Sequence, residues 1–246
     1  MTTIKICGSS SQGNGYIIES GGQALILEVG CRMMDYTWEI GDAFNTIKGC
    51  IASHYHSDHL NKSTAKEFIR RGIPMFFGEK VYEELLKEGS IMGIKPLPTA
   101  QKTFVGGFAV QPFEVPHNVP NYGFLIKTPT NERILFLTDT TGVNIRFRDI
   151  DCIMVECNHD DDTLLDNLDH HDVSMSHPEY HMGLEDCCKF CKANISTSTK
   201  QIILIHLSHQ NINEDFARQS VQDALPFVKV AVAHKGDVFN IKNDNF

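Results

Sequence analysis

The chain has 246 residues and a formal net charge of −9 at pH 7, and a chain of this length buries a substantial core. No linker-like stretch or change of composition divides it, so we expect one domain over residues 1–246. The acidic balance argues against a protein that coats nucleic acid by bulk electrostatics, and the lack of any run of about 18 apolar residues argues against a membrane-spanning helix or a membrane partner.

The chain opens on Thr3–Cys7, which we predict to form the first strand. Because this start lacks the charged head and the long apolar run of a signal peptide, we expect a cytoplasmic protein. The eight cysteines are scattered through apolar segments, and Cys187, Cys188 and Cys191 fall within about one helical turn. This distribution favours packing thiols over disulfides, a metal site or a redox site.

Apolar, β-rich runs separated by Gly or polar turns predict ten further strands, at 15–20, 24–29, 50–53, 74–77, 109–115, 122–127, 133–138, 152–156, 201–206 and 229–233. Helical patterns predict helices at about 63–71, 79–88, 183–193 and 214–224. Because many strands come before each helix, the order does not fit a regular βαβ alternation. It favours an α/β (α+β) protein in which two sheets carry helices on the outside.

One short segment, Ser53–Leu60, carries three histidines and an aspartate in the pattern H-x-H-x-D-H. Neutral imidazole and carboxylate together suit zinc, manganese or iron, and four donors this close can serve two ions. The apolar run Cys50–Ala52 before them predicts a buried strand, so His54, His56, Asp58 and His59 lie where a strand ends and a loop opens. Chemistry in α/β proteins is found at such positions.

Three more donors follow predicted strands directly. His117 comes after the run 109–115, Asp139 after Ile134–Thr138, and His206 at the end of the run 201–206. A single histidine after a strand is more often a cap or a surface residue. Three such placements beside an H-x-H-x-D-H segment instead favour a shared metal site.

The segment 160–180 is acidic, contains three histidines (His170, His171 and His177) and is the least regular part of the chain. Such a run is usually a solvated loop, and a lid that restricts access to the metals is the alternative. Asn158 and His159 lie at the end of the strand before it. We expect them either to hydrogen-bond to the metal ligands or to cap that strand.

These residues, in this order, resemble the metallo-β-lactamase fold superfamily and, within it, the small bacterial YycJ/WalJ-type metallo-hydrolases. The opening Gly8–Tyr16 is similar to that group's G-S-x-x-G-N-x-Y start, and Glu156–Asp160 to its E-x-N-H-D segment. His181–Asp186 stands where the group has an H-L-S-N-E-D-like stretch, and His206–Asn211 matches H-L-S-x-x-N. The likeness spans nearly the whole chain and implies a four-layer αββα sandwich of two mixed sheets.

The resemblance also implies two divalent metal ions, zinc first, with manganese or iron as alternatives. One ion is expected on His54, His56 and His117, the other on Asp58, His59 and His206, with Asp139 bridging them. Asp58 is expected both to ligate and to orient the hydroxide between the ions. His181 resembles a histidine that related nucleases place near the scissile phosphate, so we expect phosphate contact or general acid catalysis, with a plain structural role as the alternative. Four residues are candidates for contact with the substrate or the metal ligands: Asn158, His159, Ser208 and Asn211.

Two departures from the group's pattern bear on these roles. Met182–Gly183 replaces the expected Leu-Ser, which weakens the catalytic assignment of His181. Ala233–Gly236 stands where the group tends to carry A-Y-D-G. His234 is therefore interpreted first as a surface residue, and otherwise as a partner of the metal ligands or an extra ligand.

The resulting prediction is a metal-dependent hydrolase, a phosphodiesterase or nuclease that resembles DNA 5′-exonucleases and attacks with a hydroxide that bridges two metals. DNA or another phosphodiester is then the substrate. One alternative is a phosphodiesterase for a small or cyclic nucleotide, which an acidic surface would suit better than a long polyanion. The alternative of another class is a non-catalytic, metal-binding regulatory domain, because a fold alone does not fix a function.

Overall fold

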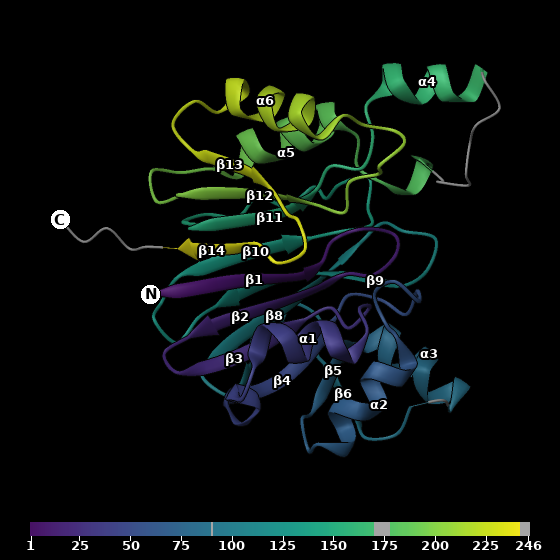
Figure 1. The fold of residues 1–246 in the computed structure, drawn as a ribbon, viewed down its shortest axis with the longest axis vertical. Coiled ribbons are helices and arrows are strands. Elements are labelled where there is room, and N and C mark those ends of the chain that lie inside the picture. The colour runs from purple at the N-terminus through teal and green to yellow at the C-terminus, as the bar shows by residue number, and fades with distance from the viewer. Residues whose placement is uncertain (90, 170–177, 242–246) are drawn as a thin grey trace.

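The computed structural model describes residues 1–89, 91–169 and 178–241, whose strands form two seven-stranded sheets (Figure 1). In spatial order, the first sheet consists of β14 (Val238–Ile241), β1 (Thr2–Gly8), β2 (Gly15–Ser20), β3 (Gln23–Leu27), β4 (Ile47–Ala52), β5 (Met75–Gly78) and β6 (Ile94–Leu97). The second consists of β13 (Lys229–Val232), β12 (Gln201–Ile205), β11 (Cys152–Glu156), β10 (Arg133–Leu137), β9 (Asn121–Lys127), β8 (Phe108–Val115) and β7 (Thr103–Val105). Both sheets contain parallel and antiparallel pairs, so both are mixed, as expected.

Helices cover the outer face of each sheet (Figure 1). The first sheet carries α1 (Met33–Ile40), α2 (Lys62–Arg70) and α3 (Glu79–Glu88), and the second carries α5 (Leu184–Asn194) and α6 (Glu214–Ala224). The chain also forms α4 (Asp161–Asp169) and two short 3-10 helices, Ala43–Thr46 and Pro178–Tyr180. This is the predicted four-layer αββα arrangement. None of the described helices is long and apolar enough to span a lipid bilayer.

Two apolar cores result from the alternation of side chains along the strands. In β10, Ile134 and Phe136 belong to the core between the two sheets, whereas Leu135 and Leu137 belong to the core under α5 and α6. Because both faces of this strand are buried, its sequence is an unbroken apolar run. The ring of Tyr16 from the first sheet packs edge-on against Phe136, with 5.7 Å between ring centroids, and joins the sheets.

The cysteines pack in these cores. All eight are free thiols, seven of them are buried, and Cys188 is half-buried. Burial raises the pKa of Cys50 and Cys152, which keeps these thiols protonated. The expectation of packing thiols therefore agrees with the structure.

The strands that precede the predicted donors end at one edge of the sandwich. In the first sheet β3 and β4 run parallel, and in the second sheet β8, β10, β11 and β12 share one direction. Three residues that directly follow or nearly follow these strands, Glu28, Asp139 and His206, have positive φ angles of 62°, 51° and 53°. Non-glycine residues seldom adopt this conformation, and strain of this kind is concentrated at functional sites.

Parts of the chain differ from the prediction. The segment 160–180 is not loop throughout, because α4 occupies its first half and a 3-10 helix lies near its end. His170, His171 and His177 lie outside the described residues. The strands β6, β7 and β14 and the helix α1 were missed: each is short, and β6 contains Pro96, which fits its place at the edge of its sheet.

Candidate metal centre

The first donor set comprises His54, His56, His117 and Asp139. Nε2 of His54 lies 3.0 Å from Nδ1 of His56, and Nε2 of His117 lies 3.4 Å from that same Nδ1. Oδ2 of Asp139 is 3.6 Å from Nε2 of His54 and 3.9 Å from Nε2 of His117. The loop after β4, the segment after β8 and the turn after β10 thus bring four donor atoms together.

The second donor set comprises Asp58, His59, His206 and, again, Asp139. Nε2 of His59 lies 3.1 Å from Oδ2 of Asp58 and 3.3 Å from Oδ1 of Asp139. For His206, Nε2 is 3.3 Å from Oδ2 of Asp58, and Nδ1 is 3.7 Å from Oδ1 of Asp139. Asp139 therefore presents one carboxylate oxygen to each donor set.

These separations suit divalent metal ions. Ligand atoms about 2.0–2.1 Å from a tetrahedral zinc ion lie about 3.4 Å from one another. The donor atoms of each set lie within 4.8 Å of one another, and the separations given above are 3.0–3.9 Å. Imidazole nitrogen and carboxylate oxygen are also the ligands that zinc, manganese and iron accept. All seven ligand candidates from the sequence lie in these two sets.

Charge differs between the two sets. Burial lowers the pKa of the three histidines of the first set, that of His117 to about 4, so their lone pairs are free at pH 7. Burial acts in the same direction on His206, but Asp139 and Asp58 outweigh it and raise its pKa to about 10. In the second set, protonated imidazole thus balances ionised carboxylate, and a divalent cation would take the place of these protons.

Glu156, at the end of β11, joins His181 to the centre. Its carboxylate is fully buried, and Oε1 lies 2.5 Å from Nδ1 of His181 and 3.1 Å from Nδ1 of His206. Its other oxygen accepts the backbone N–H groups of Thr140 at 3.1 Å and Met182 at 3.2 Å. The replacement of Leu by Met182 therefore leaves His181 beside the donor sets, because Glu156 fixes both residues.

Glu156 was not among the predicted site residues, and neither were Glu28 and Asn14. Oε2 of the fully buried Glu28 lies 3.3 Å from Nδ1 of His59, while Oε1 accepts the Ser53 N–H at 3.0 Å. Nδ2 of Asn14 lies 3.1 Å from Nε2 of His59. The signal in the sequence was an acid that ends an apolar run, at Glu28 after β3 and at Glu156 in β11.

Asn158 contacts one of the ligand candidates. Its Nδ2 donates to the backbone oxygen of His206 at 3.1 Å and lies 3.4 Å from Nδ1 of that ring. The backbone N–H of Ser208 donates to the backbone oxygen of Asn158 at 3.0 Å. The two residues thus help to fix the turn that carries His206.

His159 and Asn211 hold the chain around this turn. The His159 oxygen accepts the Leu184 N–H at 2.8 Å, and the ring nitrogen Nε2 lies 3.8 Å from Oδ1 of Asp161. The backbone oxygen of Asn211 accepts the backbone N–H of Asp160 at 2.9 Å. Their contact with a substrate or with the ligands stays a prediction.

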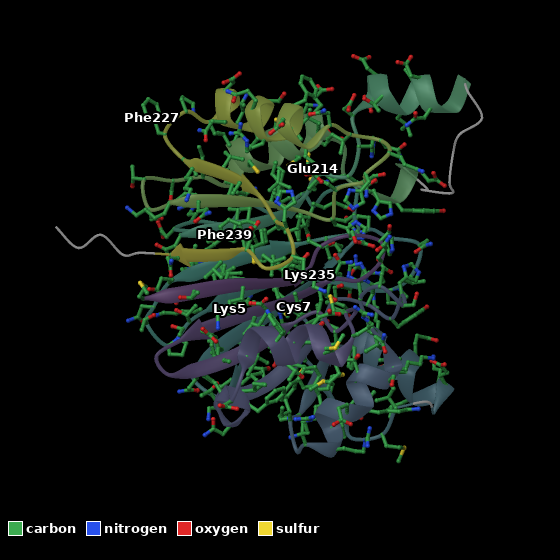
Figure 2. All side chains as sticks on the ribbon, viewed as in Figure 1. Lys5, Cys7, Glu214, Phe227, Lys235 and Phe239 are labelled. Atoms are coloured by element: carbon green, nitrogen blue, oxygen red, sulfur yellow. The ribbon has the colours of Figure 1, made fainter. Side chains whose placement is uncertain are left out.

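His234 belongs to a separate surface cluster. Its side chain is 56% exposed, with Nε2 at 2.8 Å from Glu214 and Nδ1 at 3.4 Å from Asp237. Figure 2 shows Glu214 at the start of α6, and in this view Lys235 lies between Glu214 and Cys7. The structure favours the interpretation of His234 as a surface residue.

Comparison with known proteins identifies the family. A family model described as a beta-lactamase superfamily domain matches residues 32–207. The chain is 25% identical over 242 residues to the exodeoxyribonuclease YycJ of Bacillus anthracis, with 90% of this chain and 88% of that protein covered. It is 23% identical over 260 residues to the exodeoxyribonuclease WalJ of Streptococcus pneumoniae serotype 2, with 97% and 94% covered.

A solved structure shows the same fold. The metallo-beta-lactamase fold protein YhfI of Bacillus subtilis matches with a TM-score of 0.72 at 17% sequence identity, and the match covers 97% of this chain and 98% of that one. This likeness confirms the predicted sandwich. Since the family model spans well over half of the sequence, the chain belongs to the beta-lactamase superfamily.

Proposed function

We propose that the protein is a dinuclear, metal-dependent phosphodiesterase that acts on DNA as an exonuclease. The observation that carries the proposal is the placement of Asp139, whose two carboxylate oxygens face different donor sets. A carboxylate so placed can bridge two cations, and two cations about 3.5–4 Å apart are the device by which many enzymes cleave phosphodiesters. Zinc is the proposed metal, because five of the seven ligands are imidazoles.

The residues of the centre have distinct proposed parts in the reaction. When bound, divalent cations would lower the pKa of a water to near neutral and would stabilise charge on the phosphoryl group. Asp58 faces His59 and His206 through one oxygen, and its carboxylate orients the attacking water. In the first donor set His54 is buried and His56 and His117 are partly buried, so the surrounding protein holds these rings in place for the reaction.

His181 is proposed to protonate the departing oxygen. Glu156 lies against Nδ1 of this ring, which leaves Nε2 for the substrate. Glu156 fixes the orientation of the ring. Burial lowers the pKa of His181, but Glu156 outweighs it and raises this pKa, which favours the imidazolium whose Nε2 proton the departing oxygen takes. Because Glu156 also contacts His206, the acid and a metal ligand keep a constant separation.

The choice of DNA rests on the relatives. Both curated relatives carry the name exodeoxyribonuclease, and each alignment covers at least 88% of the relative. A DNA substrate would place the protein in the compartment that holds the DNA, which in a bacterial cell is the cytoplasm. Because the protein has a net charge of −9, it has to bind DNA locally, through the proposed metal ions and a small number of basic side chains.

The test uses metal-stripped protein refilled with zinc or manganese and DNA labelled at the 5′ or the 3′ end, both single- and double-stranded. We expect metal-dependent shortening from one end, and its loss in His56→Ala and Asp58→Ala. His181→Gln should keep its bound metal but cleave about 10²–10⁴-fold more slowly. His234→Ala, which changes a histidine of the surface cluster, is the matched control and should cleave normally. Intact DNA with every metal would overturn the proposal.

A further inference from the structure

A groove of about 660 Å³ begins beside the metal centre and runs between the loop after β10 and the helix α5. At the end near the centre it is lined by Pro116, which precedes His117, and by Met182, which follows His181. Its walls are the loop segment 141–146 and one face of α5 that includes Phe190. A polymer whose reacting bond lies in the centre would meet this groove directly.

One residue, Glu156, contacts both the metal centre and the chain segments that border the groove. The carboxylate of Glu156 accepts the backbone N–H groups of Thr140 and Met182 with one oxygen and contacts His181 and His206 with the other. Thr140, at the start of the loop, and Met182, at the end of the groove near the centre, are therefore fixed relative to the donor sets. A ligand in the groove is held in register with the reacting atoms.

Arginines give the loop a local positive charge. Arg146 lines the groove, and Arg146 and Arg148 are both exposed on either side of Phe147. Phe147 is held in place on two sides. The centroid of its ring lies 4.8 Å from that of Phe113, and its backbone N–H donates to Oδ1 of Asn194 at 2.7 Å. Neither arginine forms an ion pair or a hydrogen bond with another residue in the described parts of the chain.

The other cation of the groove is already compensated. Nζ of Lys189 lies 2.9 Å from Glu185 and 3.1 Å from Asp186, both on its own helix. Of the two cations that line the groove, Arg146 is therefore the uncompensated one. Arg148 lies two residues further along the same loop, in a molecule whose net charge is −9. Guanidinium groups without a protein partner match the geometry of phosphate.

We propose that this groove binds the part of a single-stranded polynucleotide that extends beyond the bond being cleaved, with Arg146 and Arg148 on consecutive phosphates. Val143 and Ile145, which alternate with the exposed polar residues of the loop, offer apolar contact to the bases. The inference rests on the proposed function, because it assigns the path of that enzyme's substrate.

The test measures binding and hydrolysis separately. Binding of a labelled oligothymidylate of about 16 nucleotides to metal-stripped protein is followed by fluorescence anisotropy over a range of salt concentrations. The double variant Arg146→Gln/Arg148→Gln should bind about tenfold more weakly, and the slope of log K against log salt should fall by about 1.4. The control Lys102→Gln/Lys127→Gln removes two exposed cations that do not line the groove, Lys102 directly before β7 and Lys127 at the end of β9. It should bind as the unmodified protein does.

Hydrolysis of bis(p-nitrophenyl) phosphate by the metal-loaded proteins gives the second readout. This diester is too short to reach the loop, so the arginine variant should hydrolyse it at the unmodified rate. The proposal that the groove binds a polynucleotide would be overturned if the arginine variant and the unmodified protein had equal affinity for the oligonucleotide, or if neither bound it. Failure of the unmodified, metal-loaded protein to hydrolyse any diester would instead overturn the proposed function.

Discussion

Glu28 shows how single residues outside the donor sets shape the centre. It lies at a positive φ of 62° after β3, fully buried, with one oxygen against Nδ1 of His59 and the other on the Ser53 N–H. A carboxylate at Nδ1 keeps the proton on that nitrogen, so the lone pair of Nε2 faces the cation site. Burial raises the pKa of Glu28, although its contact with His59 acts in the opposite direction.

Glu28→Gln should weaken metal binding about 10- to 100-fold, because the amide orients His59 less firmly than a carboxylate does. Competition with a chromophoric chelator measures this affinity. Glu132→Gln is the matched control, since Glu132 is also buried but lies away from the centre. Equal metal affinity in Glu28→Gln and the unmodified protein would contradict this role.

The sequence shows the candidate metal donors better than the residues that orient them. His54, His56, Asp58 and His59 are adjacent in the chain, so their pattern is visible without a structure. Glu28 and Glu156 each meet an imidazole from a distant segment, and a lone acid beside an apolar run carries no sign of its partner. Their roles depend on how strands pair, which the sequence specifies only indirectly.

At the scale of elements, the loop that carries the H-x-H-x-D-H segment is packed against the turn after β3. The backbone oxygen of Asp58 accepts the backbone N–H of Asn14 at 2.7 Å, and Gly30 donates its N–H to the backbone oxygen of Asn14 at 2.9 Å. A Cβ atom at Gly30 would lie 1.6 Å from the backbone oxygen of Asp58. Glycine is therefore required here by the close approach of two backbones.

Gly30→Ala should displace Asp58, lower the free energy of unfolding by about 2–4 kcal/mol and abolish tight metal binding. Urea denaturation and metal analysis of the purified variant check both effects. In the control Gly107→Ala, the added Cβ atom meets only flexible or side-chain atoms, the nearest at 3.1 Å. Normal metal content in Gly30→Ala would contradict the account of this contact.

Elements with strong patterns were predicted nearly to the residue, whereas weak ones were missed. The helices α3 and α6 begin and end as their periodicity indicates. By contrast, α4 was hidden by its acidic composition, and β14 by its exposed position at a sheet edge, where Val238 is 50% exposed. Edge strands and surface helices bury few side chains, so their sequences carry little periodic signal.

At the scale of the whole molecule, the buried carboxylate of Glu132 joins the two sheets at the edge opposite the metal centre. Oε2 of Glu132 accepts the hydroxyl of Thr2 from β1 at 2.8 Å and those of Thr128 and Thr130, beyond β9, at 2.5 Å each. Burial alone would raise the pKa of Glu132, but these hydroxyls outweigh it and lower the pKa. The ionised carboxylate of Glu132 therefore stabilises the folded state.

Because the folded pKa lies below the unfolded one, this stabilisation is fully present above about pH 5 and is lost as the pH falls through the folded pKa. Glu132→Gln should lower the free energy of unfolding by about 1–3 kcal/mol at pH 7. The difference from the unmodified protein should narrow below about pH 4. Urea unfolding of both proteins across this range is the measurement, and a difference independent of pH would contradict the assignment.

In the proposed function, Asp139 would hold two cations that act as one hydrolytic centre. Its most direct test is titration of metal-stripped protein with zinc or manganese, with bound metal and hydrolysis of bis(p-nitrophenyl) phosphate followed together. We predict two tight equivalents and activity that rises with the second. Asp139→Asn should bind metal more weakly at both positions. The amide carries no negative charge, and its NH₂ group replaces the oxygen that one of the two donor sets receives from Asp139. Saturation at a single equivalent, or two bound equivalents without turnover, would contradict the account.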